Sequence, residues 1–243
     1  MVQAEQTGKW KAYLSYSDVQ DVEQGSGNII YVLASNNIYS YNTADQSIQT
    51  FDKTNGLSDC NISHISYNKS VKRLVIIYSN QNIDLMDDKG EVINISDYYN
   101  SSITSDKTIN DVCQSAGSAY LSTGFGIVKL NVANAEISDT YNLGFKVDYS
   151  YLDSEYIYAA SSVNGIYRAL TTSNLLDKNN WKRVADYAAK PVDNNASLVE
   201  KISKAKESIK AMKEIEKLEK EVARLKKNIE TKKAKIEELA KAL

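Results

Sequence analysis

The sequence holds 243 residues, with 29 basic and 31 acidic side chains and a formal net charge of −2. These charges are divided unevenly, because residues 197–243 sum to about +5 and the rest to about −7. An acidic first part argues against nucleic-acid binding there, while the Lys residues of the tail alternate with Glu, as on a solvated helix face. No apolar run approaches the length of a membrane-spanning helix.

The first residues give a hint about localisation. Val2, Gln3 and Ala4 resemble the small-x-small residues that remain beside a signal-peptide cleavage site. We therefore expect a mature exported protein.

A repeat of about forty residues runs through the first part of the chain. The isoleucines that anchor the same stretch in each unit, Ile38, Ile83, Ile127 and Ile166, are spaced by 45, 44 and 39 residues. Each unit has four apolar or alternating stretches joined by Gly-, Asn- and Asp-containing turns. Four short strands at this period are typical of a β-propeller blade. The predicted strands are 19–22, 29–34, 37–41 and 48–51; 62–65, 74–78, 82–85 and 92–95; 109–112, 119–122, 126–130 and 137–140; and 147–150, 156–160, 165–170 and 181–184.

The sequence therefore predicts a mainly β protein, with a propeller of about four blades over residues 8–187. The stretch 10–14 resembles a further edge strand, although the fourth blade already has one. We expect an incomplete ring that lacks at least one blade. The alternative is a closed four-bladed ring with a loose N-terminal strand.

A linker over residues 188–196 and a helical coiled-coil tail over 197–243 are expected next. After Pro191 the chain has no Gly, Pro or aromatic residue. Its apolar residues follow heptad spacing with one phase slip near Lys213 and Glu214. The pattern gives Ile215, Val222, Ile229, Ile236 and Leu243 at position a, and Leu218, Leu225, Lys232 and Leu239 at position d.

β-Branched residues at a with Leu at d favour two parallel strands, and a Lys at d lowers their stability. In such a parallel pair Glu221 faces Lys226, which is attractive, and Glu214 faces Glu219, which is repulsive. A lone helix with this apolar stripe is not a stable end state. It must pair with another chain, fold back at the phase slip or lie on the propeller, and we expect self-association.

Few residues suggest catalysis or metal binding, and we predict no enzyme and no cofactor. His64 is the single histidine, and Cys60, four residues earlier, would lie about 13 Å from it along a strand. We expect His64 to line a blade, and Cys60 and Cys113 to pack as small apolar residues.

Three other features are interpreted structurally. The run Asp87-Asp88-Lys89-Gly90 lacks the alternating acidic spacing of a calcium loop and is read as a hairpin turn. Gly124-Phe125-Gly126 lies between two strands and is therefore no phosphate loop. Among the 17 tyrosines, five could offer flat faces to a sugar or a protein, although packing between blades is the favoured interpretation. They are Tyr98, Tyr99, Tyr149, Tyr151 and Tyr167.

Several runs resemble a known family in order. Residues 53–62, KTNGLSDCNI, resemble an element of regulator-type propeller repeats from Bacteroidetes. The runs SDKTIN at 105–110, AYLSTGFGIV at 119–128 and EISDTY at 136–141 are similar to the N-terminal β-propeller of the PorZ family, surface proteins of the type IX secretion system. The resemblance covers roughly residues 8–184.

This resemblance implies a non-catalytic binding or scaffold module at the periplasm or outer-membrane surface. It implies a PorU-like sortase and anionic lipopolysaccharide as partners. Family members continue into further propeller blades, a second propeller and a sorting domain, whereas this chain continues into the helical tail, as a fused fragment or a shortened relative. The alternative function is a glycan-sensing propeller ectodomain of a hybrid two-component system. A propeller hydrolase or lyase is opposed by the lack of an acid–base constellation.

Overall fold

Four antiparallel sheets and one long helix make up the computed structural model, which describes residues 14–191 and 196–241. Each sheet has four strands paired in chain order, and we call the sheets blades 1 to 4. Blade 1 comprises β1 (Val19–Gln24), β2 (Ile29–Ala34), β3 (Asn37–Asn42) and β4 (Ile48–Phe51); blade 2 comprises β5 (Ile62–Asn68), β6 (Arg73–Tyr78), β7 (Ile83–Asp87) and β8 (Val92–Ile95). Blade 3 comprises β9 (Ile109–Ser115), β10 (Ser118–Thr123), β11 (Gly126–Asn131) and β12 (Glu136–Asn142); blade 4 comprises β13 (Tyr149–Leu152), β14 (Tyr156–Ser161), β15 (Gly165–Leu170) and β16 (Lys182–Ala185).

The hydrophobic core lies between successive blades. Side chains alternate between the two faces of a strand, so a strand between two neighbours needs apolar residues at consecutive positions. In β6, Leu74 and Ile76 belong to the core between blades 1 and 2, while Val75 and Ile77 belong to the core between blades 2 and 3. All four are completely buried. A third apolar cluster joins blades 3 and 4.

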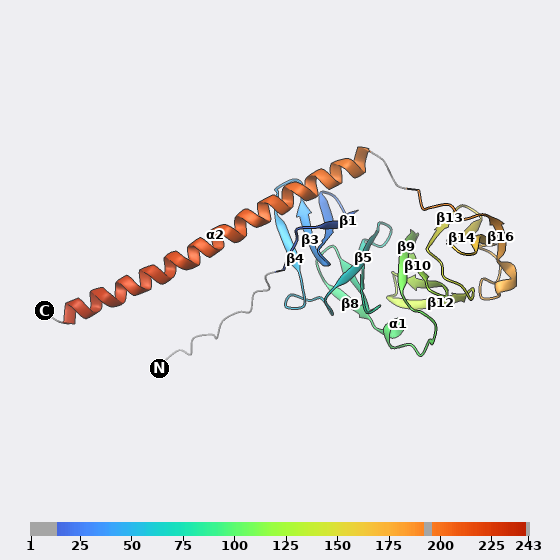
Figure 1. The fold of residues 1–243 in the computed structure, drawn as a ribbon, viewed down its shortest axis with the longest axis horizontal. Coiled ribbons are helices and arrows are strands. Elements are labelled where there is room, and N and C mark those ends of the chain that lie inside the picture. Colours follow the sequence, from blue (N-terminus) through green and yellow to red (C-terminus); the bar gives the residue numbers. More distant parts are fainter. Residues whose placement is uncertain (1–13, 192–195, 242–243) are drawn as a thin grey trace.

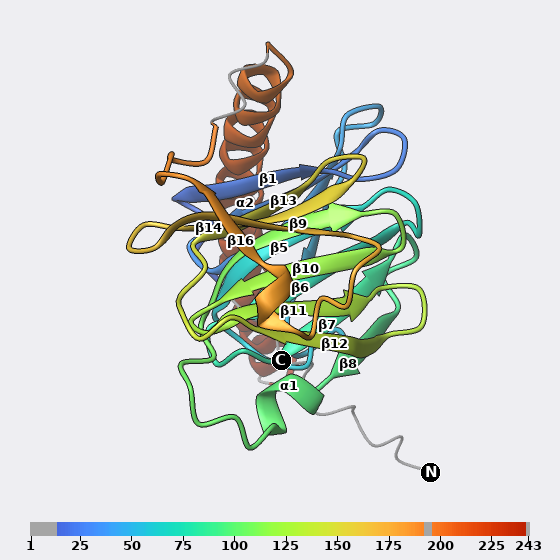
Figure 2. The ribbon, with the colours of Figure 1, turned by 90° about the vertical axis from the view of Figure 1, so that its right-hand side faces the viewer.

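The blades form an open row. The innermost strands contact one another in the order β1, β5, β9, β13. Figure 1 shows blades 1 and 4 at opposite ends of this row. Figure 2, seen along the row, shows the innermost strands along one edge of the stack and β8 and β12 along the other. The described residues therefore form an incomplete ring, as expected, and not a closed four-bladed one.

The C-terminal helix α2 (Ala196–Lys241) runs unbroken along and beyond blade 1 (Figure 1). Its Ser208 is fully buried, and its hydroxyl lies 2.8 Å from the Tyr39 hydroxyl. Met212 packs against the outer apolar face of blade 1. Because the helix continues through Lys213 and Glu214, the alternative of a fold-back at the phase slip is wrong. No helix among the described residues is both long and apolar enough to cross a membrane.

The predicted strands 62–65 and 109–112 end three residues short of β5 and β9, and the start of one strand in blade 4 is misplaced. We predicted its first strand at 147–150, whereas β13 begins at Tyr149. Val147 is fully buried before the strand begins, and its N–H donates to the Thr123 carbonyl of blade 3. An apolar residue fixed by the neighbouring blade therefore gives the same sequence signal as a strand residue. Two short helices, α1 (Asp97–Asn100) and η1 (Lys178–Asn180), were not predicted.

Candidate functional site

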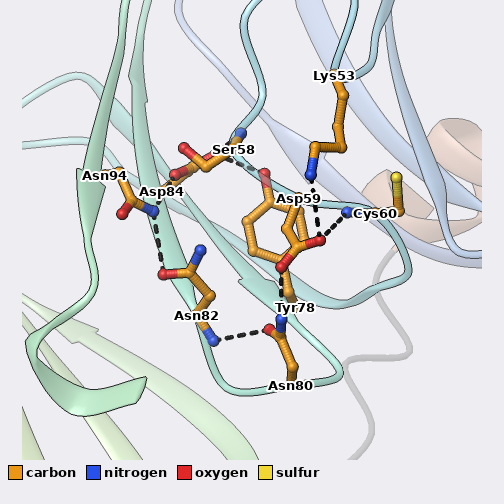
Figure 3. A network of polar contacts seen from close by, with 9 residues as sticks. All are labelled: Lys53, Ser58, Asp59, Cys60, Tyr78, Asn80, Asn82, Asp84 and Asn94. Atoms are coloured by element: carbon orange, nitrogen blue, oxygen red, sulfur yellow. Dashed lines mark hydrogen bonds and ion pairs between the residues drawn. The ribbon is translucent and has the colours of Figure 1, made fainter. Parts of the chain in front are cut away.

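The Asn-Gly-Leu-Ser element between β4 and β5 is tied down by a polar network (Figure 3). Its centre is Asp84 on β7, which is completely buried. One carboxylate oxygen accepts hydrogen bonds from the Ser58 backbone N–H at 2.8 Å and from the Tyr78 hydroxyl at 2.5 Å, and the other accepts from the Asn94 amide at 2.8 Å. Burial and the neighbouring Asp84 raise the pKa of Tyr78 above its usual range. The carboxylate is satisfied by protein donors, so the network holds the loop on blade 2 and offers no ligand site.

The second half of this network includes Cys60. Asp59 accepts from the Cys60 backbone N–H at 2.9 Å and from the Asn80 amide, and it lies 3.8 Å from the Lys53 ammonium (Figure 3). The hydrogen bond from Cys60 is the largest cause of the lowered pKa of Asp59. The Cys60 thiol is exposed, while the ring of His64 is hydrogen-bonded to the Ser63 hydroxyl at 3.1 Å. Among the described residues no hydrogen bond links Cys60 to His64, so they do not form a catalytic pair.

A second polar cluster, the axial cluster, lies where the innermost strands meet. Asp21 on β1, His64 on β5 and Asp111 on β9 occupy the same position of the repeat, one from each of blades 1 to 3. The residue just before each of them is skipped by the strand pairing, which marks a β-bulge. Bulges re-aim the side chains beside them. Lys190, after β16, joins the cluster with its ammonium 2.6 Å from Asp111 Oδ1.

Burial dominates the electrostatics of the axial cluster. It raises the pKa of Asp21 and lowers the pKa of His64, although the nearby charges of Asp111 and Asp21 act against the change at His64. Asp111 Oδ2 is buried and has no hydrogen-bond partner among the described residues. No group of three or more His, Cys, Asp or Glu in the described part of the chain could hold a metal ion. We missed this cluster in the sequence, although the repeated position of its members was a signal.

The outer face of blade 4 carries a ladder of tyrosines. Tyr151 and Tyr158 are paired across β13 and β14, and their rings stack 4.3 Å apart at an angle of 4°. Tyr149 stacks on Tyr151 at 6.1 Å, and the Arg168 guanidinium lies 4.1 Å from the centre of the Tyr156 ring. We call this surface the tyrosine face; it comprises Tyr149, Tyr151, Tyr156, Tyr158, Arg168 and Leu170.

The tyrosine face is covered only at Tyr149, which is buried, donates from its hydroxyl to the Ala188 carbonyl at 2.7 Å and packs against the Tyr187 ring. No other described helix or strand lies over it. The opposite face of blade 4 packs on blade 3 through Ile157, Ala159 and Ala169. On the tyrosine face, Tyr151 is 37 % and Leu170 is 44 % exposed. An aromatic ladder that is partly exposed can take a flat partner surface, because tyrosine contributes both apolar area and a hydroxyl.

The other tyrosines singled out in the sequence have different environments. Tyr98 on α1 is buried and donates from its hydroxyl to the Lys107 carbonyl at 2.8 Å. Tyr167 packs on Phe145 with the ring centres 4.9 Å apart. Both are packing residues, as the favoured interpretation held. Tyr99 is 48 % exposed and lies apart from the tyrosine face.

The two loop motifs behave as structural turns. The 87–90 segment closes the turn between β7 and β8, where the Gly90 N–H donates to the Asp87 carbonyl at 3.0 Å. The 124–126 segment joins β10 to β11, with Phe125 buried. A Cβ at Gly124 would meet the Asp106 carbonyl oxygen at 2.5 Å. Close packing against neighbouring backbone therefore accounts for its glycine.

A cleft of about 270 Å³ at the blade 3–blade 4 junction was not predicted. The Lys129 ammonium and the Asp139 carboxylate, 3.7 Å apart, lie in its wall. Its remaining lining is Tyr120, Tyr141, Leu152, Ile157, Thr171 and residues 173–176. No sequence signal marks it, because its walls come from separate blades and a long connection.

Comparison with known proteins gives one family match. A sequence model of the family described as the N-terminal β-propeller domain of the type IX secretion protein PorZ matches residues 30–182. Comparison with the sequences of curated proteins gives no match.

Several solved structures share the fold. PorZ of Porphyromonas gingivalis, described as an essential surface component of the type IX secretion system, is 30 % identical with a TM-score of 0.67, over 73 % of this chain and 24 % of that one. The extracellular domain of a hybrid two-component system from B. thetaiotaomicron is 16 % identical with a TM-score of 0.53, over 74 % of this chain and 23 % of that one. AztD from Citrobacter koseri is 14 % identical with a TM-score of 0.53, over 70 % and 48 %. The chain thus spans about a quarter of the first two proteins.

Proposed function

Because the chain belongs to the family of PorZ N-terminal β-propeller domains, we propose that it is a non-catalytic binding module of a type IX secretion apparatus. Its place would be the periplasm or the outer-membrane surface, in line with the surface location stated for the relative from P. gingivalis. The partners proposed from the resemblance are a PorU-like sortase and anionic lipopolysaccharide.

The observation that supports a binding role is the tyrosine face. Successive blades in the row cover each other's faces, but this one is partly exposed and rich in aromatic side chains. Tyr and Arg are the residue types that most often dominate binding energy at interfaces. Arg168 adds a cation beside the stacked rings, which suits a partner with anionic groups.

The test measures binding of the full chain to two immobilised ligands, anionic lipopolysaccharide and a PorU-like sortase. We expect one of them to bind, and Tyr151→Ala to weaken that binding about tenfold, as for a central aromatic contact. Tyr99→Ala is the matched control, because it removes a tyrosine elsewhere that is at least as exposed as Tyr151. Binding of neither ligand, or equal binding by both variants, would contradict the proposal.

The second candidate is a glycan-sensing ectodomain of a hybrid two-component system. The shared fold with such an ectodomain and the long helix after the propeller support it. This role predicts binding of free oligosaccharides without a sortase. Self-association through α2 involves other residues and is a separate proposal.

A further inference from the structure

The second half of α2 presents an apolar stripe that no other described element covers. Its members are between 49 and 65 % exposed. We call this stripe the seam; its described members are Ile215, Leu218, Val222, Leu225, Ile229 and Ile236. Six large aliphatic side chains in line on one helix face are far more than a solvated helix normally shows.

The seam is separate from the part of α2 that packs on the propeller. Ser208 and Met212 contact blade 1, and the seam begins at Ile215, directly after the phase slip in the heptad pattern. Since successive helical residues are about 100° apart, the seam points roughly a quarter turn away from the direction of blade 1. A second helix can therefore lie along the seam without displacing the contacts of Ser208 and Met212.

We propose that the seam pairs with the seam of a second copy of this chain, in antiparallel orientation. The a and d residues favour two strands and by themselves a parallel pair, but the charged flanks and Lys232 favour the antiparallel orientation. In an antiparallel pair each layer joins an a position of one helix to a d position of the other. In the register centred near position 227, Val222 lies opposite position 232 and Leu225 lies opposite Ile229. Residues at position g of one copy then face position g of the other, and residues at position e face position e.

The charges flanking the seam fit this orientation. With the layers above, Glu221 of each copy faces Lys235 of the other, and Glu219 faces Lys233. Because the pair is symmetric, each of these attractive contacts occurs twice. The two Lys226 residues, one from each copy, face each other once at the centre, which is repulsive. A parallel pair instead balances the attraction between Glu221 and Lys226 against the repulsion between Glu214 and Glu219. Charged flanks of this kind set helix orientation.

Lys232 gives an independent argument for the same orientation. It occupies a d position of the seam. A parallel pair would place the two Lys232 side chains in one layer, where like charges repel in partly dehydrated surroundings. In the antiparallel pair each Lys232 packs beside Val222 of the other copy, and the two ammonium groups are separated by the central layers.

The antiparallel arrangement also leaves room for both propellers. The pair is centred near position 227, so the two Met212 residues lie about 45 Å apart along the coil. Each propeller stays beside its own helix, at opposite ends of the dimer. Residues 213–241 of the two copies overlap, which leaves Ser208 and Met212 on blade 1.

The test compares dimer affinities of full-chain variants by sedimentation at low ionic strength. We expect a dimer that Val222→Glu abolishes. Glu221→Lys and Lys235→Glu should each weaken it about tenfold, because two attractive contacts become repulsive. The double variant should regain affinity within about threefold. Glu230→Lys, the same charge change away from the seam, should leave affinity unchanged.

Each other outcome decides against the proposal. A monomer at all concentrations would show that a second copy is not the occupant, and a trimer would exclude two strands. Failure of the double variant to recover would indicate parallel helices, since the positive charge introduced at position 221 would still face Lys226. As a second measurement, Val222→Cys in a Cys60→Ser background should give no disulfide-linked dimer, because only a parallel pair brings the two 222 positions together.

Discussion

At the scale of single residues, the local backbone decides what the axial cluster can do. The alternating pattern would send every second residue of an inner strand to the same face, but a bulge at Gln20, Ser63 or Asn110 breaks the alternation. The side chain that follows is re-aimed toward the neighbouring inner strands. Asp21 and His64 thus become half-buried beside one another's charges, where desolvation favours a neutral imidazole over a charged one.

This environment predicts an acid-shifted titration of His64. Its pKa is lowered, mainly by burial, so the native protein binds this proton less tightly than the unfolded chain, with its pKa of about 6.5. The free energy of unfolding should therefore fall as the pH drops below about 6.5, until the native pKa is passed. Proton NMR can follow the ring directly, since this is the single histidine.

The denatured protein in urea supplies the reference titration. A native midpoint at or above the denatured one would contradict the half-buried, desolvated position of His64. In His64→Gln the slope of stability against pH between about 5 and 7 should decrease, because the group that gives rise to it has been removed.

At the scale of elements, the strands were predictable because sandwiched strands must be apolar on both faces. The run 74–78 was assigned correctly for this reason, as were both central strands of every blade. The start of β13 was misplaced, since Val147 is fixed by blade 3 rather than by its own sheet. The β-strand propensity of a residue reflects how well it fits a buried position, and it does not indicate which neighbouring sheet buries it.

The candidate surfaces were less predictable than the strands. Tyr149 and Tyr151 were noted in the sequence, but the stacking of Tyr151 on Tyr158 and the exposure of that face depend on which side of blade 4 is covered. The axial cluster needs bulges, which are not visible in an alternating pattern. Both features arise from the relation between blades, while the sequence signal is local to each strand.

The hairpin between β10 and β11 gives a prediction at this scale. Gly126 has φ +157°, and an added Cβ would lie 2.0 Å from the Tyr141 carbonyl oxygen on β12. Gly126→Ala should lower the free energy of unfolding by about 2–4 kcal/mol, measured by urea denaturation, because β11 and β12 must separate. Gly117→Ala is the control, since its Cβ would find no atom nearer than 3.6 Å. Equal free energies of unfolding for the two variants would show that β12 moves away from β11 at little cost.

At the scale of the whole molecule, the four blades have eight sheet faces, and the two ends of the row differ. Three apolar clusters between blades cover six faces. The outer face of blade 1 is covered by α2 through Ser208 and Met212. The tyrosine face is the eighth; among the described residues Tyr187 and Ala188 cover it at Tyr149, but no helix or neighbouring blade covers the rest. A helix therefore takes the place of a neighbouring blade at one end, while the other end stays available to a partner.

If α2 replaces a blade, then loosening it should affect blade 1 alone. Met212→Asp places a carboxylate against the apolar cluster of Val32, Tyr39 and Tyr41, which is unfavourable without a partner. Hydrogen exchange at amides of β3 should become about tenfold faster, since local opening costs less, whereas exchange in β14 of blade 4 should not change. Dimerisation should persist, because Met212 lies outside the seam. Faster exchange in all four blades would mean that α2 stabilises the row as a unit, and unchanged exchange in β3 would mean that the helix does not act as a cover.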